Sequence, residues 1–288
     1  MNNIFVSTTF VPDGSPLRDA LELCNGTTIQ SIEIGSNHCF EENYQYLLDY
    51  DFQYLVHNYF PIPKKSFVIN IASQSSETRE MSIKHIKKAI DYCNLINAKL
   101  YTFHPGFLTD PNGSNLSVEN YDFQWDNKKL IKSNSESARQ NMYSSLDEII
   151  EYAKRRGISI AIETEGSLHK KEHLLMQRPS EYTEFMQKYS NTDIGINLNI
   201  GHLNLASKAF NFGRKEFVDH VQNYIIAMEL SHNDGKEDEH LPLKPNLWYW
   251  DIIHNERFKE VYKILEFRNT PIDRILDSIN LFSNKNDI

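Results

Sequence analysis

The feature that most constrains the fold is one local pattern repeated along the whole chain: a short β-rich run, then a helical segment. The runs are rich in Ile, Val, Phe and Tyr, and four to eight residues of each are typical of a buried strand. They begin at Asn3, Ile29, Phe52, Ala98, Ile158, Ile194, Ile225 and Val261. Strict alternation of strands with helices predicts a parallel sheet.

Helical periodicity marks the segments between and after these runs. The expected helices are Pro16–Cys24, Glu41–Tyr50, Glu77–Asn97, Ser137–Arg156, Ser180–Tyr189, Leu205–His220, Pro245–Asn255 and Thr270–Phe282. Gly157 directly follows the fourth and is a typical C-terminal signal.

Eight such units in a chain of 288 residues match the size of an α/β protein with the (β/α)8 TIM-barrel fold, for which about 250 residues is usual. No linker is visible, so we expect one domain over residues 1–288. A doubly wound open sheet is the alternative. Because no GxGxxG or GxxxxGK[ST] motif follows any strand, the nucleotide signatures of that fold are missing.

One connection is too long for an ordinary loop. Residues 107–133, after the fourth strand, contain "DPNGSN" and then "YDFQWD". Loops of this length in compact domains are usually functional or disordered. The aromatic residues predict a lid-like loop, and a surface excursion packed on the barrel is the alternative.

Charge and cysteine content limit the partners. The net charge is -9, which gives no basic footprint for nucleic acid, although a local cationic groove is not excluded. No stretch reaches the roughly 20 apolar residues of a membrane span. Three cysteines without CxxC spacing give no disulfide framework or thiolate cluster. We therefore expect a cytoplasmic protein with no membrane partner and no nucleic-acid partner.

Metal-binding residue types end six consecutive strands. In a barrel of this kind the βα loops converge at the C-terminal ends of the strands, and the chemistry lies there. The candidates are His57, His104, Glu163, Asn199 and His202, Glu229 and His232, Asp238 and His240 in the loop beyond, and Glu266.

Each candidate alone has a simpler explanation, a hydrogen-bonded histidine or a glutamate that faces water. Together, so many imidazoles and carboxylates would repel and desolvate one another without a cation. Imidazole and carboxylate ligands without thiolate suit Zn²⁺, Mn²⁺ or Fe²⁺. The sequence therefore predicts a divalent metal site, with zinc or manganese as the expected metal and the number of ions open.

These residues lie in motifs that resemble the xylose-isomerase-like barrels, which include sugar isomerases, sugar epimerases and abasic-site nucleases of the endonuclease IV type. The matching pieces are "HNYFP", "FHPGF", "IETEG", "NIGHLN", "HNDGKEDEHLPL" and "ILEFR". The resemblance extends from "IEIG" to "ILEF" and implies a TIM barrel. Its nuclease branch implies metal ligands at His57, His104, Glu163, His202, Asp238, His240 and Glu266. Its epimerase branch implies that Glu163 and Glu266 are ligands that flank the substrate.

Two positions depart from the family pattern. Asn199 stands where both branches usually have Asp, and Glu229 stands where they usually have His on the seventh strand. Asn can still coordinate through its carbonyl oxygen, as a neutral and weaker ligand. Glu229 or His232 could replace the missing histidine. These changes leave the number and identity of the metals open.

The leading hypothesis is a divalent-metal-dependent isomerase or epimerase that acts on a sugar or sugar derivative through an enediolate. Glu163 and Glu266 are the expected proton-transfer pair, and Tyr59, Asn199 and Lys236 are the expected substrate contacts. One alternative is a metal-cluster phosphodiesterase or abasic-site endonuclease, and another is a barrel that binds a metal or ligand without turnover. Barrels of this type often pair, so a homodimer is considered, although no sequence pattern identifies an interface.

Overall fold

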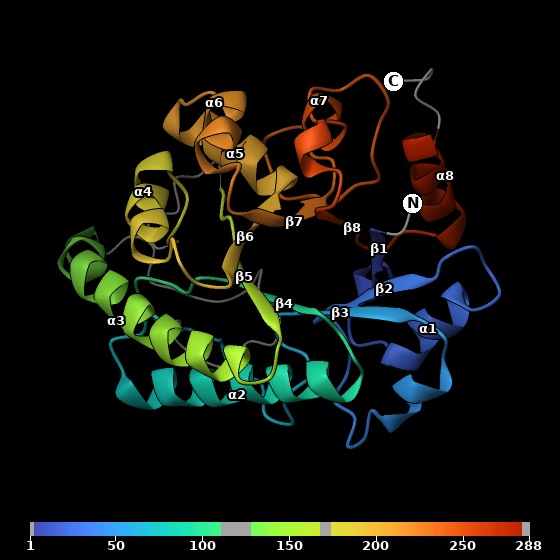
Figure 1. The fold of residues 1–288 in the computed structure, drawn as a ribbon, viewed down its shortest axis with the longest axis horizontal. Helices are drawn as coiled ribbons and strands as arrows, with labels where there is room; N and C mark the ends of the chain where they lie inside the picture. Colours follow the sequence, from blue (N-terminus) through green and yellow to red (C-terminus); the bar gives the residue numbers. More distant parts are fainter. Residues whose placement is uncertain (1–2, 111–127, 168–173, 284–288) are drawn as a thin grey trace.

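The computed structural model describes residues 3–110, 128–167 and 174–283 and closes eight parallel strands into a barrel in chain order (Figure 1). The strands are β1 Ile4–Ser7, β2 Ser31–Ile34, β3 Gln53–His57, β4 Leu100–Phe103, β5 Ser159–Glu163, β6 Ile194–Asn199, β7 Ile225–Leu230 and β8 Tyr262–Leu265. All eight predicted runs contain a strand. Pairing of β1 with β8 closes the barrel, and the predicted (β/α)8 fold is confirmed.

Helices lie around the outside of this barrel (Figure 1). They are α1 Leu17–Cys24, α2 Ser76–Leu95, α3 Lys128–Lys154, α4 Pro179–Lys188, α5 Ile200–Phe210, α6 Arg214–Val221, α7 Trp250–Ile253 and α8 Ile272–Ser283, with 3-10 helices η1 Thr8–Phe10, η2 Gln45–Asp49 and η4 Glu256–Phe258. No helix in the described part of the chain is long and apolar enough to cross a membrane.

The expected helices were wrong in several details. The segment after β2 is the short 3-10 helix η2, and the helix expected at 245–255 is the four-residue α7. The single helix expected at 205–220 is two helices, α5 and α6. Asn211 has a positive φ of 55°, a conformation that ends a helix, and Gly213 then begins α6 as its N-cap.

The long loop is shorter than expected at its far end. α3 begins at Lys128, so the last part of the predicted 107–133 lid is helical. Residues 111–127, which include the aromatic residues on which the lid prediction depended, lie outside the described residues. The lid therefore stays a prediction.

Two layers of side chains fill the inside of the barrel. The lower layer is a buried apolar cluster contributed by six strands: Phe5, Leu55, Leu100, Ala161, Ala227 and Ile264. Successive side chains of a strand point to opposite faces, so every second residue points the same way. Two residues further along the same strands lie Ser7, His57, Thr102, Glu163, Glu229 and Glu266, all buried. The upper layer, at the C-terminal end or mouth of the barrel, is therefore polar and ionisable.

Candidate metal centre

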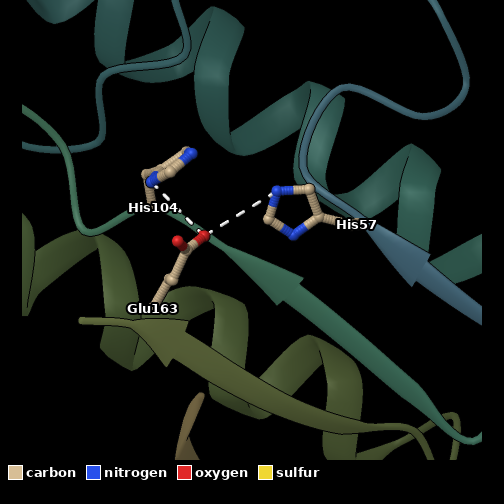
Figure 2. A group of neighbouring side chains, drawn as sticks. All are labelled: His57, His104 and Glu163. Carbon is tan, nitrogen blue, oxygen red and sulfur yellow. Dashed lines mark ion pairs between the residues drawn. The ribbon is translucent and has the colours of Figure 1, made fainter. Parts of the chain in front are cut away.

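Three strand ends bring His57, His104 and Glu163 together at the mouth. Figure 2 shows the three side chains, from β3, the end of β4 and β5, pointing toward one another. The Oε2 atom of Glu163 lies 3.8 Å from Nε2 of His57 and 3.5 Å from Nδ1 of His104. Among the described residues this buried oxygen accepts no hydrogen bond. Two imidazoles and an unpartnered carboxylate oxygen form a group that suits a divalent metal.

Hydrogen bonds hold the two histidines of this group in place. Nδ1 of His104 lies 2.7 Å from Oε1 of Glu165, and Nδ1 of His57 lies 2.8 Å from the hydroxyl of Thr102. Metal-binding histidines usually bond through one ring nitrogen to such an outer partner, which fixes the ring orientation. Glu165 and Thr102 are in the positions of such partners.

A second group consists of His202, Asp238 and His240. The Oδ2 atom of Asp238 lies 3.1 Å from Nε2 of His202 and 2.8 Å from Nε2 of His240. Nδ1 of His202 lies 2.8 Å from the carbonyl oxygen of Thr164. A carbonyl only accepts, so this Nδ1 carries the proton, and Nε2 is the ring nitrogen that could bind a metal.

The arrangement at His240 is similar, but the contact of its Nδ1 is an ion pair without a hydrogen bond among the described residues. Its Nδ1 lies 3.1 Å from Oε2 of Glu266 while its Nε2 faces Asp238. Both histidines of the second group thus direct Nε2 at one shared carboxylate oxygen, with an acceptor behind each Nδ1. The donor set and its outer partners fit a divalent metal.

The mouth balances its own charges through the histidines. Burial alone lowers the pKa of an imidazole, but the facing carboxylates outweigh it at three positions. Glu163 and Glu165 raise the pKa of His104 to about 9. Asp238 and Glu266 raise the pKa of His240 to about 10. Asp238 and Glu163 raise the pKa of His202 well above its ordinary value. In the absence of metal these three rings are therefore cationic at neutral pH.

The carboxylates divide into two classes. Burial favours the neutral form of each, but the histidines hold the pKa values of Glu163, Asp238 and Glu266 below their ordinary range. Glu33 and Glu229 have no such compensation: burial, and then the neighbouring carboxylates, raise their pKa values well above the ordinary one. These histidines thus favour the ionised form of Glu163, Asp238 and Glu266, whereas the surroundings of Glu33 and Glu229 favour the neutral form.

Three residues of the mouth were missed from the sequence. Glu165 supports His104, and the side-chain amide of Asn197 donates to Oε1 of Glu229 at 2.6 Å. Glu33 of β2 is fully buried and, within the described residues, neither carboxylate oxygen has a hydrogen-bond partner; it forms a third potential metal group with His57 and Glu229. A lone Glu in the apolar strand "SIEI" was the available signal for Glu33.

The structure brings most predicted site residues together and leaves three apart. His57, His104, Glu163, Asn199, His202, Glu229, Asp238, His240 and Glu266 all line the mouth. His232 does not: its backbone pairs with Leu241 and its ring packs on Tyr249. Ala227 and Glu229 of β7 face the barrel interior, so the last strand residue, Leu230, faces outward and packs in the outer core. His232 comes after the end of β7, where the chain has left the barrel wall.

The predicted substrate contacts Tyr59 and Lys236 are also placed outside the mouth. The hydroxyl of Tyr59 accepts the backbone N–H of Ile69 at 2.8 Å, and its ring lies beside His85 of α2. The side chain of Lys236 is 77% exposed and pairs with Asp234 at 3.1 Å. The third predicted contact, Asn199, is fully buried in the mouth of the barrel.

A family model and solved structures of other proteins agree with the TIM-barrel fold of this chain. A family model described as xylose isomerase-like TIM barrel matches residues 19–285. An uncharacterized protein of Methanocaldococcus jannaschii is 25% identical over 266 residues, 88% of this chain and 78% of that protein. The crystal structure of a D-tagatose 3-epimerase-like protein has a TM-score of 0.73 and 22% identity, covering 98% of this chain and 96% of the other. A Thermus thermophilus protein soaked with ZnCl₂ has a TM-score of 0.64 and 14% identity over 98% of each chain.

We expect His104→Ala to lower the metal content of the purified protein by about one equivalent, because it removes one of three ligands of the first group. His232→Ala is the matched control, since His232 lies outside the three groups, and it should keep the full content. Elemental analysis of protein grown with Mn²⁺ and Zn²⁺ measures both. Full metal occupancy in His104→Ala would show that His104 is no ligand.

We also expect the chelator-treated protein to lose thermal stability as the pH rises from 7 to 10.5. The folded-state pKa values of His104 and His240 are raised to about 9 and about 10. Their contribution is therefore complete below the unfolded value of about 6.5 and is lost as the pH rises through the folded values. His240→Gln cannot titrate, so its Tm should fall less steeply; parallel Tm curves for the two proteins would contradict the assignment.

Proposed function

The chain belongs to the xylose isomerase-like TIM barrel family, and from this membership and the geometry of its candidate metal centre we propose that it is a divalent-metal-dependent isomerase or epimerase of a sugar or sugar derivative. The D-tagatose 3-epimerase-like protein with a similar fold supports this choice of substrate class. Zinc and manganese are the metals that the imidazole and carboxylate donors favour.

The observation that carries the proposal is a pair of buried carboxylates at one barrel mouth, whose facing histidines lower their pKa values. Glu163 ends β5 and Glu266 follows β8, and both are buried. Each has one oxygen, Oε2, that accepts no hydrogen bond among the described residues. Glu163 raises the pKa of Glu266, and both raise the pKa of their neighbour Glu33, so the two carboxylates lie close enough to interact electrostatically.

A carboxylate that is ionised and has an unoccupied oxygen can accept a proton from carbon. In an epimerisation or aldose–ketose isomerisation, a proton leaves the carbon next to a carbonyl group and returns to the same or the neighbouring carbon. One of the two glutamates accepts that proton, and the other returns a proton that it has first taken up from solvent. The reverse reaction exchanges their roles.

The candidate metal ligands lie around this pair and include Glu163 itself. His57, His104 and Glu163, and His202, Asp238 and His240, are the residues that would hold metal. A divalent ion held by these residues would supply Lewis-acid polarisation of the sugar carbonyl and hydroxyl groups. Burial of the mouth limits access of water to the reacting carbon.

We expect Glu163→Gln and Glu266→Gln each to reduce solvent-deuterium exchange into a bound ketose by about 10² to 10⁴-fold, the usual contribution of a general acid or base. Glu237→Gln, in an exposed loop position, is the matched control and should exchange normally. Proton NMR on a panel of ketoses, with metal content measured for each variant, checks this. Unchanged exchange in metal-loaded Glu163→Gln and Glu266→Gln would refute the pair.

A metal-dependent phosphodiesterase of the abasic-site nuclease type is the second candidate. It is favoured by the presence of two separate ligand groups, which are more than a one-metal enzyme needs. Neutralisation of several phosphates would require a basic groove, and the overall charge of -9 weighs against one.

Because we propose the isomerase or epimerase as the leading function, we expect the purified, metal-loaded protein not to cleave a synthetic abasic duplex. The assay uses gel separation of an end-labelled duplex at low salt, where electrostatic binding is strongest. Metal-dependent cleavage that disappears in Asp238→Asn would reverse the order and make the nuclease the leading function.

A further inference from the structure

Asn199 lies between two acids of the metal centre. Its amide nitrogen Nδ2 donates to Oε1 of Glu163 at 2.9 Å and to Oε2 of Glu229 at 3.0 Å. All three side chains are buried, with exposed fractions of 1% or less. The two N–H groups of one neutral amide thus occupy the space between two carboxyl groups.

The orientation of this amide is fixed by α5. Asn199 is the N-cap residue of that helix, and its Oδ1 accepts the backbone N–H of His202 at 3.0 Å. A backbone N–H can only donate, so the atom that faces it is the carbonyl oxygen. The nitrogen must therefore face the two acids. Rotation of the amide to offer Oδ1 to a metal would remove the cap and destabilise the start of α5.

The second acid is satisfied without a metal. Oε1 of Glu229 accepts from Asn197 at 2.6 Å, and Oε2 accepts from Asn199, so each oxygen has an amide donor. Buried polar groups need such partners. Glu163 differs: only its Oε1 is bound by Asn199, and its Oε2 faces the two histidines of the first metal group. The amide of Asn199 thus separates Glu229, whose two oxygens both have amide donors, from the oxygen of Glu163 that faces the first metal group.

We propose that Asn199 takes the place of a cation between Glu163 and Glu229, so that divalent ions bind on either side of it and not at it. The first position is the group His57, His104 and Glu163, and the second is the group His202, Asp238 and His240. Glu229 is then a partner of the amides and not a metal ligand. This inference rests on the metal binding in the proposed function and not on the sugar chemistry.

The substitution Asn199→Asp tests this with a minimal change. Asp replaces only the amide NH₂ by oxygen, and it is as good an N-cap as Asn, so the start of α5 is kept. The two donors become an acceptor that faces two acids, and a cation is then needed to hold the three together. Asn255→Asp is the matched control, because Asn255 caps η4 in the same way by accepting the N–H of Arg257.

We expect Asn199→Asp to bind one more equivalent of Mn²⁺ than the wild type, and Asn255→Asp to bind the wild-type number. Chelator-treated Asn199→Asp should have a lower Tm than chelator-treated wild type, and Mn²⁺ should raise its Tm by more. Equal stoichiometry and an equal Mn²⁺-induced shift in Asn199→Asp and wild type would overturn the proposal.

Anomalous scattering from Mn²⁺-soaked wild-type crystals gives a test that does not depend on the variant folding. Peaks at the two flanking groups, with none within coordination distance of Asn199, support the proposal. A peak coordinated by Asn199 or Glu229 overturns it while leaving metal dependence intact. Absence of any bound ion in metal-replete wild type overturns both the proposal and the metal dependence of the proposed function.

Discussion

The carboxylate of Glu163 is the group on which the organisation of the mouth depends. One of its oxygens faces His57 and His104, and the other accepts from Asn199 and lies 3.1 Å from His202. A buried carboxylate is costly unless it is paired and hydrogen-bonded. These neighbours hold the pKa of Glu163 below its ordinary value, and the histidines among them belong to the two candidate metal groups.

The same contacts connect the secondary structure to the chemistry. Asn199 ends β6, caps α5 and holds two acids with one amide, so the start of that helix and the charge pattern of the mouth are determined together. Below this level lies the apolar cluster, and on the six strands that contribute to it the change from an apolar to a polar or ionisable side chain takes only two residues. A closed barrel thus has the hydrophobic stabilisation of a core and an ionisable centre directly above it.

The strands were predictable because each run is short, β-rich and bounded by turn residues, whereas the helix errors come from local backbone choices. Asn211 in the left-handed region splits one expected helix, and periodicity does not show that. In the site, position after a strand identified the ligand candidates. It did not separate His232, which lies after the chain has turned into the loop, from His202 and His240, which lie in the mouth.

The sequence by itself determined the parallel barrel and the kind of residue at each strand end, because both follow from local periodicity and from the convergence of parallel strands at one end. Only the tertiary structure decided which atoms face one another. It placed Glu33 without a hydrogen-bond partner among the described residues, put Glu165 behind His104, and turned the amide of Asn199 toward two acids. Those contacts join residues distant in sequence, and their distances depend on barrel closure, which no local pattern encodes.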